Sequence, residues 1–122
     1  MFDRNTQNLW LDYFLGFGAM VPTVRTLALA MEDGQRLFPH WKSEVLATGR
    51  DQFPMNTAGV IMGCDIVRVG FEDNIYLPNG SSAQRNHQLV EAMVNIAQTF
   101  GREPASVEDA RAVFAIDRRN AV

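Results

Sequence analysis

The sequence contains one cysteine and two histidines among its 122 residues. A single thiol, Cys64, cannot form an intrachain disulfide, and its isolation argues against a zinc site built from thiolates. His40 and His87 do not have the spacing of a metal-ligating pair, so both are interpreted as structural residues. Such cysteine usage is typical of a reducing compartment, and we expect a cytoplasmic protein.

Long apolar runs and an excess of positive charge are also missing. No stretch approaches the roughly 18 apolar residues that a membrane-spanning helix requires. The first residues, Met1 to Asn5, do not have the layout of a signal peptide. The formal net charge of -3 gives no basic footprint for nucleic acid. We therefore expect neither a membrane nor a nucleic acid as partner.

The remaining composition, 47% hydrophobic and 20% charged, is typical of one small globular domain. Strand-like and helix-like stretches alternate along it. We expect strands at 11–17, 41–48 and 64–72, helices at 24–38, 55–62, 83–100 and 107–116, and loose ends at 1–10 and 117–122. This alternation predicts an α/β fold with right-handed βαβ units and parallel strands. Three strands leave two open edges, so the chain is expected to be part of a larger barrel or of an assembly.

Several residues mark where the predicted helices begin and end. Thr23 and Ser106 are expected to cap the amino ends of two helices, and Pro54 suits the first turn of a third. Gly63 suits the position after that helix. Gly34 is expected to end or kink the first helix, because glycine is a poor helix former.

The stretch from Cys64 to Asn74 is the one that points to chemistry. If it is a strand, Val67, Val69 and Phe71 form its apolar face, and the opposite face carries Arg68, Gly70 and Glu72. Helices on both sides suggest a strand that is covered on both faces. Charged side chains at such a place are costly unless they pair with each other or bind something.

Active sites of parallel α/β folds gather at the carboxyl ends of the strands, which here are the loops 18–22, 49–53 and 72–76. Glu72 is either a metal ligand or an ion-pair partner of Arg68, although residues four apart in a strand lie about 13 Å from each other. Arg68 binds a substrate carboxylate or forms a structural pair. Asp73 is a general base or a residue that orients Arg68, and the alternative is a helix-cap or loop carboxylate. Gly49 and Arg50 resemble an anion-binding turn, and the alternative is a solvated loop arginine.

The segment Arg68-Val69-Gly70-Phe71-Glu72-Asp73-Asn74 resembles the RVGLEDN-type signature of the β-keto acid cleavage enzymes. This family includes the 3-keto-5-aminohexanoate cleavage enzyme of lysine fermentation. Other pieces agree in the same order: Phe14-Leu15-Gly16, the segment 41–50, Pro54-Met55-Asn56 and Gly101-Arg102-Glu103-Pro104-Ala105. The resemblance covers roughly residues 11–115.

The resemblance implies a (β/α)8 TIM barrel that binds one divalent metal, usually zinc. It also implies a transferase that combines a β-keto acid with acetyl-CoA and produces acetoacetate and a new acyl-CoA. By position, Glu72 matches the carboxylate that binds zinc. Arg68 and Asp73 match the catalytic pair, with Asp73 as the base. A homo-oligomer is expected.

The chain departs from the family pattern in two ways, and these departures leave two alternatives for its function. The family barrel is more than twice as long as this chain, and its two zinc-binding histidines lie in a His-x-His motif that this sequence lacks. The chain therefore corresponds to the last three βα units, the C-terminal part of an incomplete barrel. It either contributes Arg68, Glu72 and Asp73 to such an enzyme, or it is a non-catalytic half-barrel that acts only with a complementary chain. The sequence does not identify the β-keto acid.

Overall fold

A computed structural model describes residues 9–116 of the chain. Three strands, β1 (Trp10–Leu15), β2 (Lys42–Ala47) and β3 (Ile66–Val67), form a parallel sheet in the order β1-β2-β3. The helical elements are α1 (Val24–Leu37), the short 3-10 helix η1 (Gly49–Asp51), α2 (Gln52–Met62), α3 (Asn86–Thr99) and α4 (Val107–Val113). The predicted α/β alternation and parallel sheet are confirmed. Within the described residues the sheet is open.

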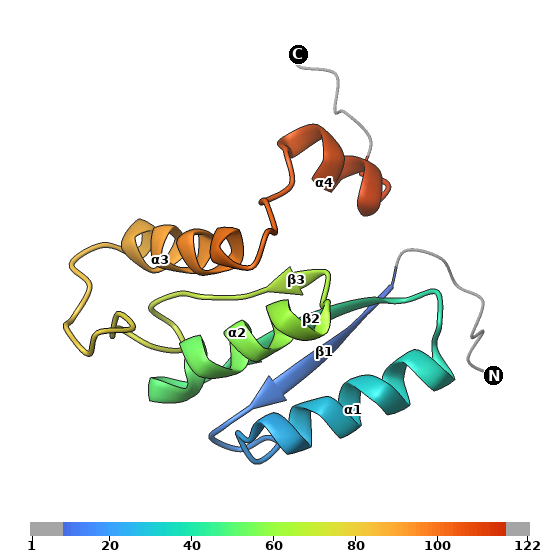
Figure 1. The fold of residues 1–122 in the computed structure, drawn as a ribbon, viewed down its shortest axis with the longest axis horizontal. Helices are drawn as coiled ribbons and strands as arrows, with labels where there is room; N and C mark the ends of the chain where they lie inside the picture. Colours follow the sequence, from blue (N-terminus) through green and yellow to red (C-terminus); the bar gives the residue numbers. More distant parts are fainter. Residues whose placement is uncertain (1–8, 117–122) are drawn as a thin grey trace.

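The helices α1 and α2 cover one face of the sheet (Figure 1). The strand residues on this face are buried together with apolar residues of the two helices: Tyr13, Leu15, Leu27, Val45, Ala47, Met55 and Ala58. Burying each larger aliphatic side chain stabilises the fold by about 1.5–3 kcal/mol. A second cluster joins α2 to α3 through Phe53, Val60, Leu89 and Met93. The helix layer is thus held to one side of the sheet, and the alternate strand residues lie on the other.

The predicted capping residues are confirmed. The side chain of Thr23 accepts a hydrogen bond from the Thr26 amide at 3.1 Å, and Ser106 accepts one from the Asp109 amide at 3.1 Å. Gly63 ends α2 with a positive φ of 87°, a conformation that glycine adopts without strain.

Gly34 does not end α1, contrary to one of the two predictions for it, because the helix continues to Leu37. The reason for a glycine here is a close approach to β1. A Cβ atom at Gly34 would lie 1.9 Å from the Tyr13 hydroxyl and 2.8 Å from Leu11 Cδ1.

The third strand is much shorter than the predicted 64–72. Only Ile66–Val67 pair with β2, and the chain then turns, with the amides of Asp73 and Asn74 both donating to Gly70 O. Phe71 consequently lies outside any strand and is 41% exposed, so the predicted apolar face does not extend to it.

The bounds of other elements also differ from the predictions. The segment 49–53 is not a loop, since η1 leads directly into α2. The last two helices are shorter than predicted, because α3 begins at Asn86 and α4 ends at Val113. Trp10, predicted to belong to a loose end, begins β1. Residues 1–8 and the predicted tail 117–122 lie outside the described residues.

Candidate active site

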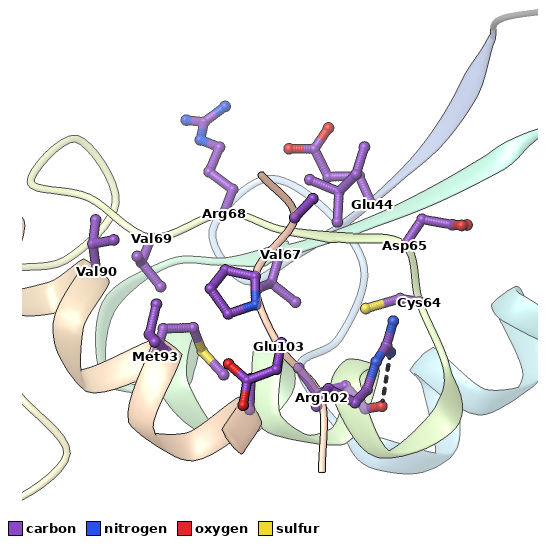
Figure 2. Close-up of a pocket in the computed structure, with 16 residues that line it drawn as sticks. Glu44, Cys64, Asp65, Val67, Arg68, Val69, Val90, Met93, Arg102 and Glu103 are labelled. Carbon is purple, nitrogen blue, oxygen red and sulfur yellow. Dashed lines mark hydrogen bonds between the residues drawn. The ribbon is translucent and has the colours of Figure 1, made fainter. Parts of the chain in front are cut away.

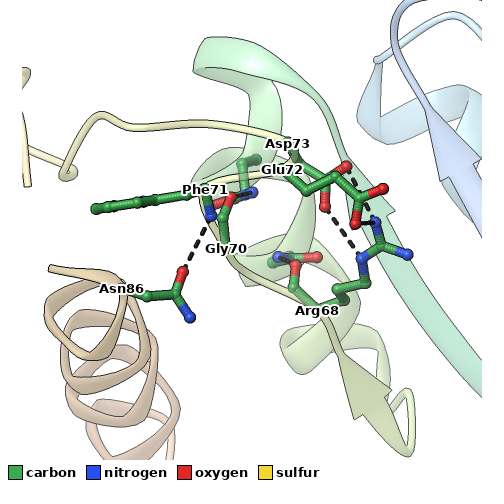
Figure 3. Close-up of polar contacts among 8 residues, drawn as sticks. Arg68, Gly70, Phe71, Glu72, Asp73 and Asn86 are labelled. Atoms are coloured by element: carbon green, nitrogen blue, oxygen red, sulfur yellow. Dashed lines mark hydrogen bonds and ion pairs between the residues drawn. The ribbon is translucent and has the colours of Figure 1, made fainter.

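Arg68, Glu72 and Asp73 lie together just beyond the carboxyl end of β3 (Figure 3). Arg68 Nε donates to Asp73 Oδ2 at 3.0 Å, and Arg68 Nη2 donates to Asp73 Oδ1 at 3.2 Å. The same Nη2 donates to Glu72 Oε2 at 3.0 Å. The bidentate pair with Asp73 fixes the plane of the guanidinium, because both groups are planar and their bonds are parallel. The three residues predicted from the sequence are therefore brought into direct contact.

The turn after β3 explains why Arg68 reaches Glu72. In a continuous strand the two would be about 13 Å apart, but the chain reverses at Gly70. The two carboxylates have different surroundings, since the side chain of Asp73 is 6% exposed and that of Glu72 is 84% exposed. Asp73 is therefore held in one position, whereas Glu72 is accessible to a further partner.

Two buried amides of α2 hold the backbone of this segment. Asn56 Nδ2 donates to Arg68 O at 2.6 Å, and Gln52 Nε2 donates to Gly70 O at 3.4 Å. Both amides are fully buried. They replace the bonds that a longer β3 would have formed, and they position the Arg68 side chain. These two amides were not predicted from the sequence, although two amides within an apolar helix are a signal of buried polar anchoring.

The segment is also anchored from its other sides. The Gly49 amide donates to Asp73 O at 2.7 Å, which joins the end of β2 to the candidate base. The Phe71 amide donates to Asn86 Oδ1 at 3.0 Å, which joins the turn to the start of α3 (Figure 3). The position of the Arg68–Asp73 pair is therefore set by β2, α2 and α3 together.

Two further carboxylates, Asp12 and Glu44, share the face of the sheet that carries Arg68. They are paired neighbours in the β1–β2 register, and Glu44 in turn pairs with Ile66 of β3. Partial burial raises the pKa of both groups. The charge of Asp73 raises the pKa of Asp12 further, and Arg68 opposes both shifts. This pair was not predicted from the sequence, in which the only signal is a carboxylate inside each apolar strand.

The remaining candidates are placed away from this cluster. The guanidinium of Arg50 lies over the Tyr76 ring, 5.6 Å from its centroid. His40 and His87 are both exposed. Cys64 is buried in the core as predicted, and burial raises the pKa of its thiol to about 11, so it is not a reactive thiolate near neutral pH.

A cavity of about 500 Å³ runs along the open side of β3 (Figure 2). Val67, Arg68 and Val69 line one wall, and the opposite wall is formed by α3 and the segment 102–105. Arg102 Nη1 donates to Val60 O at 3.1 Å and holds that segment against α2. The cavity therefore lies where a fourth strand could join the sheet.

The chain is similar to known proteins over most of its length. The family model of the beta-keto acid cleavage enzyme matches residues 3–116. The 3-keto-5-aminohexanoate cleavage enzyme of Acetoanaerobium sticklandii is 46% identical over 74 residues, which are 61% of this chain and 27% of the relative. That of Fusobacterium nucleatum is 42% identical over the same shares.

The 3-oxoadipate:acetyl-CoA acetyltransferase of Cupriavidus necator is 29% identical over 109 residues, 88% of this chain and 38% of the relative. The chain thus spans between about a quarter and two fifths of the curated relatives it matches. The family match covers nearly the whole sequence, and the chain belongs to the beta-keto acid cleavage enzyme family.

Proposed function

We propose that this chain contributes the arginine–carboxylate part of the active site of a zinc-dependent enzyme. The enzyme reacts a β-keto acid with acetyl-CoA and gives acetoacetate and a new acyl-CoA. The contact of Arg68 with both Asp73 and Glu72 carries the proposal, because it places a cation, a held carboxylate and an accessible carboxylate at one site. In the complete enzyme, the three strands are the last part of a TIM barrel, whose active site lies at this end of the strands.

Asp73 is proposed as the base that removes a proton from the acidic carbon between the two carbonyl groups of the substrate. Both of its oxygens accept bonds from Arg68, and each keeps a second lone pair that can take the proton. Arg68 has a third nitrogen, Nη1, which donates no hydrogen bond to the described residues. This nitrogen is available for the substrate carboxylate, so one side chain orients both the base and the substrate.

Glu72 is proposed as one ligand of the zinc ion. Its Oε2 accepts from Arg68 Nη2, while Oε1 is not engaged by the described residues. A carboxylate oxygen of this kind fits the ligand chemistry of zinc. No group of three metal-binding side chains occurs within residues 9–116, so the other ligands must come from elsewhere. Bound zinc would polarise the keto oxygen and stabilise negative charge on it.

We also propose that the enzyme acts on a small β-keto acid, lies in the cytoplasm and forms a homo-oligomer. The names of the relatives make 3-keto-5-aminohexanoate and 3-oxoadipate the first substrates to test. The free thiol of Cys64 is consistent with a reducing compartment. Among the described helices, none is long and apolar enough to cross a membrane.

The experiment combines metal analysis with an assay for acetoacetate formed from acetyl-CoA. In the assembled enzyme, Glu72→Gln is expected to reduce zinc content and activity together. Glu91→Gln on the exposed surface of α3 serves as the matched control and should change neither. Unchanged zinc content in Glu72→Gln would remove Glu72 from the metal site.

A second candidate function follows from the cavity along β3. The chain could act as a half-barrel without activity of its own, which binds a complementary chain through this edge. Phe14 and Trp10 lie on the face of the sheet opposite α1 and α2 and remain partly exposed, although the Trp10 ring packs edge-on against Phe114, and this exposure favours such an association. Measurement of the mass in solution tests it, because a stable monomer that stays monomeric when mixed with the rest of the barrel would exclude it.

A further inference from the structure

A separate cavity of about 720 Å³ lies between α2, the loop 74–80 and α3. Its volume is in the range of small-molecule sites, which is about 300–1,000 Å³. Its lining includes Arg50, Phe53, Thr57, Tyr76 and Asn79. All the walls belong to residues that the structure describes. The cavity is therefore formed without any further strand, unlike the one beside β3.

Arg50 is the only charged residue among those lining this cavity. Within the described residues it forms no ion pair, and its guanidinium lies over the ring of Tyr76. The aromatic ring replaces water on one face of the guanidinium and leaves its N–H groups at the edge for a ligand. The wall carries no carboxylate, so the cavity favours an anion.

The backbone that carries the Tyr76 ring is held in place by Asn74. The side chain of Asn74 is buried, donates to Tyr76 O at 2.6 Å and accepts from the Tyr76 amide at 3.1 Å. Asn79 Oδ1 accepts from Ser81, and its Nδ2 is free for a ligand within the described part of the chain. The cavity thus combines a cation, an aromatic ring on a held backbone segment and an amide donor. Phosphate binds to arginine, and a nucleobase stacks on an aromatic ring.

A backbone hydrogen bond links the residue before Arg50 to the candidate active site. Arg50 follows Gly49, whose amide donates to Asp73 O at 2.7 Å. A long ligand could therefore place its phosphorylated end at Arg50 and its reactive end near Asp73. We infer that this cavity binds the phosphorylated adenosine end of an acyl-CoA. The inference rests on the proposed function for the identity of the ligand and on the cavity for its place.

The test is a calorimetric titration of the purified chain with adenosine 3′,5′-bisphosphate, the nucleotide portion of CoA. Arg50→Met is expected to weaken binding about tenfold or more, since a charge-assisted hydrogen bond is lost. Arg36→Met is the matched control, because Arg36 lies on α1 in an exposed pair with Asp33. Circular dichroism of each variant establishes that it is folded. Equal affinity of Arg50→Met and the native chain would overturn the inference.

Two further titrations identify what part of the ligand is recognised. Tyr76→Leu should weaken the bisphosphate several-fold more than it weakens inorganic phosphate, because the base stacks on the ring, whereas phosphate depends on the ring only through its contact with Arg50. Inorganic phosphate that binds as tightly as the bisphosphate would overturn the nucleotide assignment and leave a simple anion site. These measurements involve no catalysis, so absence of acetoacetate formation would refute the proposed function without altering their result.

Discussion

Replacing Asp73 by asparagine tests the central contact of the site without any assay of activity. The substitution keeps the size of the side chain and removes its charge. One of the two acceptor oxygens becomes an NH₂ group that faces the N–H groups of Arg68, so the bidentate pair is lost. We expect a loss of stability that is set by how much water can reach the guanidinium left behind.

The magnitude follows from the exposure of the two partners. Removal of one partner from a fully buried ion pair costs about 3–5 kcal/mol. The Asp73 side chain is 6% exposed, but that of Arg68 is 40% exposed and recovers part of its hydration. We therefore expect the free energy of unfolding to fall by about 1–3 kcal/mol. Glu72→Gln removes a bond to the same arginine from an exposed carboxylate, and its cost should be about 0.5 kcal/mol or less.

Urea unfolding of the intact chain, followed by circular dichroism, measures both variants. The difference between them should persist in high salt, because salt screens an exposed pair more strongly than a buried one. If Asp73→Asn and Glu72→Gln destabilise the chain equally, the assignment of Asp73 as the held carboxylate is wrong. The same result would weaken its proposed role as a positioned base.

Three other predictions concern the sheet. Gly34→Ala should destabilise the chain by about 1–2 kcal/mol in urea unfolding, because overpacking against the buried Tyr13 outweighs the gain in helix propensity. No loss would show that β1 can move away from α1. Burial raises the pKa of Asp12 in the fold, so Asp12→Asn should stabilise the chain at pH 7, and the gain should fade as the pH falls toward 3.8. A gain that is independent of pH would contradict this cause. Partial burial acts to raise the pKa of Asp65, but hydrogen bonds from Ser43 and Lys42 lower it overall. Asp65→Asn should therefore reduce the free energy of unfolding at pH 7, and this loss should disappear as the pH falls below 3.8. A cost that persists in acid would show that packing, and not charge, is responsible.

The parts of the fold that were predictable from the sequence depend on neighbouring residues. Thr23 and Ser106 cap helices through contacts three residues away, and Gly63 terminates α2 through its own backbone conformation. The order of strands and helices follows from apolar periodicity in the same way. These features were correctly predicted because no distant residue alters them.

The length of β3 could not be predicted, because it is decided by contacts across the fold. A run of alternating apolar residues favours a strand through 72, but Asn56 takes the carbonyl of Arg68 and the chain turns at Gly70. The strand assumed from the sequence therefore gave the wrong geometry for Arg68, Glu72 and Asp73. In a strand the Cα atoms of Arg68 and Glu72 would lie about 13 Å apart. The turn instead lets Arg68 Nη2 approach Glu72 Oε2 to 3.0 Å.

The pairing of Asp12 with Glu44 adds an electrostatic argument that no single strand reveals. Their register places both carboxylates on the face of Arg68, which already binds Asp73 and Glu72. The guanidinium of Arg68 thus forms ion pairs with two carboxylates and interacts over a longer distance with two more. Like charges that are partly shielded from water repel one another. Burial is the main cause of the raised pKa values of Asp12 and Glu44, and a neighbouring carboxylate adds to each shift. A divalent cation on Glu72, together with ligands from outside the described residues, would offset part of this surplus of negative charge.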